Sequence, residues 1–210
     1  MTSSNEHCGC EVTVKSQREK HILLIVLTLN VFMFVAEFGA GILSHSTALL
    51  ADSLDMFADA FVYGLSLFAL GRDQIWRNHA ALANGILQLL IGLGIAMEAV
   101  NKLFLETIPL ADIMGIFGIL ALVINTICFV LLKQFRDGDI NLRAVWICSR
   151  NDMLANLGVL LAAILVVFTQ SAWPDIVIGL LIASVIVHSA WKIVAESTSM
   201  KPASKNRQRL

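Results

Sequence analysis

The chain has 210 residues, of which 57% are hydrophobic and 15% are charged, with a formal net charge of −1. An ordinary soluble domain contains roughly 25% charged residues, and a chain of this length cannot hide so much apolar surface from water. The composition therefore excludes a soluble globular protein and makes lipid the expected solvent.

Six apolar stretches follow one another along the chain, and each is long enough to cross a hydrocarbon core of about 30 Å. They comprise Ile22–Leu43, Thr47–Leu70, Ala80–Phe104, Leu110–Leu132, Ala144–Phe168 and Trp173–Val194. Because the connections are short, successive helices should be antiparallel neighbours. The expected fold is an all-α integral membrane protein with six transmembrane helices, which form a transport domain over residues 21–196.

The basic residues predict the orientation of these helices. Lys and Arg gather in the two tails and in the second and fourth connections, whereas the first, third and fifth connections contain none. The positive-inside rule then places both termini in the cytosol. The first twenty residues are polar and precede an apolar run too long for a signal peptide, so we expect residues 1–20 and 197–210 to form cytosolic tails. In a prokaryote the protein would span the inner membrane several times.

The four cysteines do not suggest a disulfide framework. Cys8 and Cys10 lie in the N-terminal tail, while Cys128 and Cys148 lie inside apolar stretches, so free thiols are expected. In the tail, His7, Cys8 and Cys10 form a cluster of soft or borderline ligands. The cluster either collects a thiophilic cation or is part of an ordinary reduced tail, and the sequence leaves both readings open.

Three aspartates lie within the second apolar stretch, where each ionisable side chain is costly and is therefore a functional candidate. At about 100° per residue, Asp52, Asp55 and Asp59 fall within an arc of about 60° on one side of a helix. Three acids on one stripe repel each other unless protons or a cation compensate their charge. A helix that simply lines a water-filled groove is the alternative explanation.

The fifth stretch carries a complementary pair, because Cys148 and Asp152 are one helical turn apart on one face. If the second and fifth helices run antiparallel, Asp59 can lie beside Cys148 and Asp55 beside Asp152. Four such ligands converging from two helices are typical of a tetrahedral zinc-type site. The alternative is that Cys148 only fills space in the core.

These residues resemble a known family, the cation diffusion facilitators. The run from Ser46 to Asp59 reads Ser-Thr-Ala-Leu-Leu-Ala-Asp-Ser-Leu-Asp-Met-Phe-Ala-Asp, and it matches the family pattern that ends in [His/Asp]-x-x-x-Asp. Asp55 and Asp59 fall on that pair. Cys148 and Asp152 fall on the second pair, His-x-x-x-Asp, with Asn156 following as in the family.

The resemblance covers nearly all of residues 22–196, and weaker matches support it at Glu37, Asn84, Glu98, Asp175 and Glu196. It implies proton-coupled export of zinc or a chemical relative by a homodimer. Two differences stand out. The family's fifth-helix histidine is replaced by Cys148, and the soluble metal-binding domain that usually follows the sixth helix is not expected here.

Charge balance gives an independent reason to expect proton coupling. Asp55, Asp59, Asp152 and a Cys148 thiolate would together carry four negative charges against one divalent cation. An empty site in a low-dielectric bundle cannot keep all four groups unprotonated. Binding of the metal must therefore release protons, and reprotonation must release the metal.

Other polar residues in the helices are auxiliary candidates, namely Asp52, Asn156, Glu37 and Arg150. Arg150 lies on a different face from Cys148. It either pairs with Glu37 or Glu98, offsets the negative charge at longer range, or extends toward the cytosolic interface. Glu98 and Lys102 are one turn apart, and this spacing predicts a local ion pair.

The sequence therefore predicts a secondary transporter that exports zinc or cadmium from the cytosol in exchange for protons, and not an enzyme. The alternatives are a carrier for iron, cobalt, nickel or manganese, and a membrane metal sensor or scaffold that does not transport. No prosthetic group is expected. The expected partners are membrane lipids, the transported cation and a second copy of the chain, without nucleic acid.

Overall fold

The computed structural model describes residues 17–68, 74–105, 107–133 and 140–199. These ranges contain six helices, with the bounds α1 Gln17–Ser44, α2 Thr47–Phe68, α3 Gln74–Leu105, α4 Ala111–Lys133, α5 Ile140–Thr169 and α6 Trp173–Ser199. Helices are the expected result, because in lipid a spanning segment must satisfy its backbone hydrogen bonds internally. The predicted all-α fold with six helices is confirmed.

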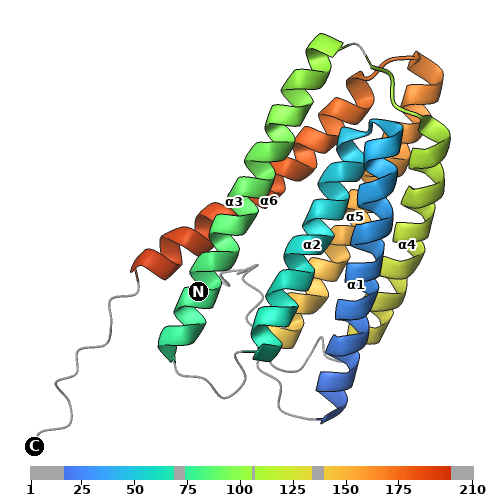
Figure 1. Ribbon diagram of the computed structural model, residues 1–210. Helices are drawn as coiled ribbons and strands as arrows, with labels where there is room; N and C mark the ends of the chain where they lie inside the picture. Colours follow the sequence, from blue (N-terminus) through green and yellow to red (C-terminus); the bar gives the residue numbers. More distant parts are fainter. Residues whose placement is uncertain (1–16, 69–73, 106, 134–139, 200–210) are drawn as a thin grey trace, which may run out of the picture.

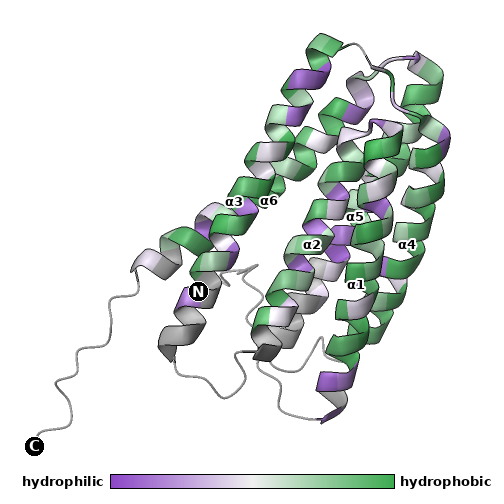
Figure 2. Ribbon diagram, viewed as in Figure 1, coloured by the Kyte–Doolittle hydropathy of each residue, from purple (hydrophilic) through white to green (hydrophobic). Residues whose placement is uncertain are grey.

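Five of the helices are long and apolar enough to cross a membrane, counting only the described residues. The remaining helix, α2, has 22 residues but carries three aspartates. Hydrophobic residues cover most of the helix surfaces in Figure 2, and hydrophilic residues interrupt α2 and α5 near the middle of the bundle. The chain is a multi-pass integral membrane protein whose polar residues gather in the interior.

Several helices begin earlier than the apolar stretches predict. Helix α1 begins at Gln17 instead of Ile22, α3 at Gln74 instead of Ala80, and α5 at Ile140 instead of Ala144. Hydropathy locates the part of a helix that faces lipid, whereas the hydrogen-bonded ladder can extend beyond that part into polar residues. The predicted tail of residues 1–20 therefore includes the first turn of α1.

The helices form two groups that pack against each other. Helices α1, α2, α4 and α5 pack as a four-helix group, and α3 and α6 form a pair that contacts it through α2 and α5. We call the end where α1 begins and α6 ends the inner end. Toward the inner end, α3 and α6 separate from the other helices (Figure 1).

Close packing between α3 and α6 depends on glycine. A Cβ atom at Gly92 would lie 2.4 Å from the Cγ2 atom of Val187, and one at Gly85 would lie 2.8 Å from the Cγ2 atom of Val194. These distances are too short for any side chain larger than hydrogen. Small residues at these two positions of α3 therefore permit close contact with α6 within the chain.

At the opposite, outer end, one buried carboxylate ties three helices together. Asp175, in the first turn of α6, accepts hydrogen bonds from the Ser46 hydroxyl at 2.5 Å and from the backbone N–H groups of Thr47 and Ala48 at 2.8 and 3.1 Å. It also forms a 2.6 Å ion pair with Lys102 of α3. Asp175 thus caps the start of α2, where the helix dipole favours negative charge. Lys102 pairs with Asp175 and not with Glu98, which is exposed.

Candidate metal site

A small pocket lies between the four-helix group and the α3–α6 pair. Four helices supply its walls, and the lining residues are Asp55, Asp59, Val62, Asn84, Gln88, Asn151, Asp152, Val185, Ile186 and Ser189. Its volume of about 50 Å³ exceeds the 10–15 Å³ that one water needs, so it has room for a cation with a few waters. The pocket is therefore both polar and large enough to hold a partly hydrated ion.

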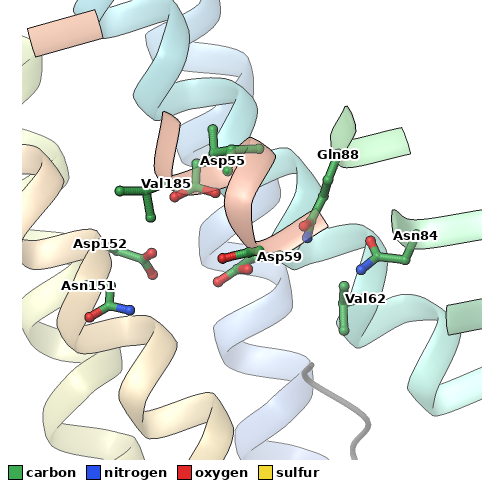
Figure 3. Close-up of a pocket in the computed structure, with 10 residues that line it drawn as sticks. Asp55, Asp59, Val62, Asn84, Gln88, Asn151, Asp152 and Val185 are labelled. Carbon is green, nitrogen blue, oxygen red and sulfur yellow. The ribbon is translucent and has the colours of Figure 1, made fainter. Parts of the chain in front are cut away.

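Three of the predicted ligands line this pocket together. Asp55 and Asp59 come from adjacent turns of α2, and Asp152 comes from α5. Figure 3 shows all three carboxylates directed into the same space. Asp59 and Asp152 are buried, and the Tyr63 hydroxyl donates a 3.3 Å hydrogen bond to Asp59 from one turn farther along α2. The prediction that α2 and α5 present their acids to each other agrees with this arrangement.

The described side chains of the pocket do not form a complete coordination site for one ion. Among the side chains that the structure describes, no three His, Cys, Asp or Glu side chains lie close enough together to hold one ion. Cys148 lies in α5, one turn before Asp152, but its side chain is outside that description. The four-ligand set predicted from the sequence therefore stays a prediction, with three of its members placed around one pocket.

Asp52 has different neighbours from the two acids of α2 that line the pocket. It does not line the pocket but lies beside Glu37 of α1, and both side chains are almost completely buried. Two carboxyl groups this close share a hydrogen bond when one of them holds a proton. Asp52 and Asp59 point in nearly the same direction from α2, but they are seven residues apart, which separates them by about 10 Å along the helix axis.

The other auxiliary candidates have different surroundings. Asn156 is buried one turn after Asp152, and its side-chain amide donates a 2.5 Å hydrogen bond to the Asp152 carbonyl, so it supports the α5 backbone. Arg150 is exposed, and within the described ranges it forms no ion pair with Glu37 or Glu98. The predicted N-terminal cluster of His7, Cys8 and Cys10 lies outside the described residues.

The sequence patterns predict little of the neutral half of the pocket. Asn84 is one match to the family pattern, whereas Gln88, Asn151 and Ser189 belong to none of the predicted sites. A signal was present, because Asn84 and Gln88 are polar residues one turn apart in an apolar stretch. They therefore share one face of α3, and that face turns toward the acids.

In chemical terms the pocket is lined by oxygen donors at the interface between two groups of helices. Carboxylates attract divalent cations strongly where the dielectric constant is low, and amide or hydroxyl oxygens add ligands without adding charge. Nothing in this arrangement resembles a nucleophile with an adjacent base among the described lining residues. The geometry favours binding and release of a cation.

Comparison with known proteins finds relatives that are named as metal transporters. It is 31% identical to the zinc transporter ZitB of Yersinia pestis over 188 residues, which are 83% of this chain and 60% of that protein. It is 27% identical over 192 residues to the cadmium, cobalt and zinc/H(+)-K(+) antiporter of Bacillus subtilis, covering 85% of this chain and 62% of the relative.

The metal cation efflux system protein CzcD of Cupriavidus metallidurans is also 27% identical over 192 residues, covering 85% of this chain and 60% of that protein. The chain thus spans 60–62% of the length of these relatives. A family model described as the cation efflux transmembrane domain matches residues 23–200. Because this match covers most of the chain, and because its acids line a pocket inside a helical membrane bundle, the chain belongs to the cation efflux family.

Proposed function

We propose that this chain exports a divalent transition-metal cation, zinc or cadmium, from the cytosol in exchange for protons. The observation that carries the proposal is the convergence of Asp55, Asp59 and Asp152 on one pocket between two groups of helices. Charged residues inside a membrane bundle are retained where they serve a transport path or an ion site. The relatives are named as zinc, cadmium and cobalt transporters, and this agrees with such a cargo.

Exchange with protons follows from the charge of the site. Three carboxylates, together with a thiolate if Cys148 takes part, exceed the charge of one divalent cation. Without metal, some of these groups must bind protons, because like charges in a low-dielectric pocket cannot all stay ionised. Metal and protons therefore compete for the same oxygens, and a proton gradient can drive the cation outward.

We propose that Cys148 completes the site as its fourth ligand. It is one turn from Asp152 on α5, which is the spacing at which two side chains share a helix face. A thiolate favours zinc and cadmium over magnesium and calcium, which prefer six or more oxygen ligands. We also expect the chain to work as a homodimer. If its source is bacterial, like that of the named relatives, it belongs in the inner membrane.

The first prediction tests the three carboxylates. Asp59→Asn keeps the size of the side chain but removes a charged ligand, so we expect metal flux into proteoliposomes to fall at least about a hundredfold. The matched control is Asp112→Asn, which removes the same charge from an exposed position in the first turn of α4. We expect that control to transport normally.

Zinc and cadmium flux would be followed with a metal dye trapped in the vesicles. Normal flux through Asp59→Asn would show that the cation does not use this pocket. Saturable metal binding by the unaltered chain without any flux would instead support a membrane sensor or scaffold. Flux of manganese, iron, cobalt or nickel in preference to zinc and cadmium would show that the chain is a carrier for one of those metals.

A further inference from the structure

The wall of the pocket opposite the acids carries two amide side chains from one helix. Asn84 and Gln88 are one turn apart on α3, and only 5% and 8% of their surfaces are exposed. Figure 3 shows both amides extending from α3 into the pocket on the side of Asp59. They belong to the α3–α6 pair, whereas the acids belong to the four-helix group.

Both amides have an unsatisfied oxygen. Within the described part of the chain, neither Oδ1 of Asn84 nor Oε1 of Gln88 has a hydrogen-bond partner, although both atoms are buried. A buried polar atom without a partner costs free energy, so such atoms are rare unless water or an ion completes them. Carboxylates in the ionised form that binds metal cannot satisfy these oxygens, since they only accept hydrogen bonds.

A bound cation could contact the amide oxygens of α3 and the carboxylates of the pocket at the same time. Amide oxygens are ligands for divalent cations and differ from carboxylates in that they bring no charge. The pocket already holds excess negative charge, so neutral oxygens are the donors that add coordination without adding repulsion. The carboxylates alone do not enclose a common point. Besides the proposed Cys148, further donors can come from water or from another wall, and α3 supplies two neutral oxygens.

We propose that Asn84 and Gln88 contact the transported cation and supply neutral oxygen ligands from α3 while the acids of α2 and α5 hold it. This inference rests on the proposed function and extends it to a second wall of the same pocket. A bound cation then bridges the two groups of helices and draws them together. Binding of the cation is in this way coupled to the position of the α3–α6 pair relative to the four-helix group.

The first test measures affinity for Zn²⁺ and Cd²⁺ in the purified full-length chain in lipid nanodiscs, by calorimetry. Asn84→Leu and Gln88→Leu preserve bulk and remove the amide oxygen, and each should weaken binding by about tenfold. Asn101→Leu is the matched control, because Asn101 lies on the same helix but is exposed. That control should bind as the unaltered chain does.

The second test asks whether the position contacts the metal itself. Asn84→Cys places a thiol on the same wall, and with Cd²⁺ it should add the thiolate-to-cadmium charge-transfer absorption of one thiolate to the ultraviolet difference spectrum. Asn101→Cys should add none. A thiol near the cation but out of contact would change affinity without adding absorption, so this signature separates ligation from a structural role.

The outcomes separate this inference from the proposal on which it rests. Weaker binding by both leucine variants, with the added absorption in Asn84→Cys, supports ligation from α3. Binding within twofold of the unaltered chain for both leucine variants overturns it, and so does an absent absorption in an Asn84→Cys protein that still binds cadmium. In both cases the unaltered chain binds metal, so the proposed transport function stands. Failure of the unaltered chain to bind zinc and cadmium would instead refute the proposed function.

Discussion

At the scale of single residues, the metal preference of the pocket depends on the side chains that lie one helical turn before Asp59 and Asp152. Asp55 precedes Asp59 by one turn on α2, and Cys148 precedes Asp152 by one turn on α5. The first pair is all oxygen and the second mixes oxygen with sulfur. Because oxygen favours hard cations and sulfur favours soft ones, the residue at position 148 should determine which metals are preferred.

The second prediction concerns the residue at position 148. Cys148→His removes one negative charge but keeps a borderline nitrogen ligand, so we expect zinc flux to persist while cadmium flux falls severalfold. Cys148→Ser replaces the thiolate with a weakly coordinating hydroxyl, and we expect it to lower both fluxes. Zinc and cadmium flux would be compared in the three proteins. Unchanged flux of both metals through Cys148→Ser would mean that Cys148 only fills space beside the ligands.

A buried residue in this protein can also serve structure while resembling a ligand. Asp175 is fully buried and ionisable, but its oxygens are occupied by the start of α2 and by Lys102. Asn84 and Gln88 are also buried, yet their oxygens have no partner among the described residues. Asn84 and Gln88 therefore differ from Asp175 in combining an unsatisfied buried oxygen with a place in the wall of the pocket.

At the scale of helices, the contact between α3 and α6 is set by backbone proximity. Gly92 faces Val187 of α6 so closely that a methyl group has no room, whereas a Cβ atom at Gly94, two residues later, would meet nothing within 4 Å. The two positions lie on the same helix and differ only in the face that they occupy. They form a matched pair for testing how much the close α3–α6 contact contributes to stability.

The third prediction uses this pair. Gly92→Ala should lower the melting temperature of the purified protein, because the added methyl forces α3 away from α6. Gly94→Ala should leave it unchanged or raise it, since Ala is favoured over Gly in a helix by about 1 kcal/mol. Thermal unfolding in the same detergent would be followed for both variants. Equal melting temperatures would show that the close α3–α6 contact contributes little to stability.

The sequence predicted the helices and the acids of α2 and α5 because those features are local. Apolar runs predict the helices, and a spacing of four residues places Asp55 and Asp59 on one face of α2. The expectation that Asp152 lies opposite them also needs α2 and α5 to run antiparallel side by side. The placement of Asp52 beside Glu37 depends on which neighbour each turn of α2 meets, which is a property of tertiary packing. The pairing of Lys102 with Asp175 joins residues 73 positions apart, and no spacing rule predicts it.

At the scale of the whole molecule, the pocket lies where two helix groups meet. The acids stand on the four-helix group, and the amides of Asn84 and Gln88 stand on the α3–α6 pair. At the outer end the two groups are joined by the Asp175 cluster, while toward the inner end α3 and α6 separate from the rest (Figure 1). A movement of one group relative to the other would therefore change the pocket and its access together.

The fourth prediction concerns assembly. We expect a homodimer that uses the lipid-facing sides of α3 or α6, which carry exposed apolar side chains such as Leu93, Met97 and Trp191. Native mass spectrometry of the protein released from nanodiscs would give the number of chains per particle. Particles with the mass of a single chain would contradict this expectation.

Exchange of a divalent cation for protons at one pocket can be tested by recording zinc flux and proton flux in the same vesicles. Proteoliposomes containing the purified chain would carry a zinc dye and a pH dye in the lumen. We expect that added zinc enters the vesicles while protons leave. An imposed outward proton gradient should accelerate zinc entry, and Asp59→Asn should abolish both the zinc signal and the pH signal. Zinc entry that proceeds without proton movement, or that persists in Asp59→Asn, would contradict exchange at this pocket.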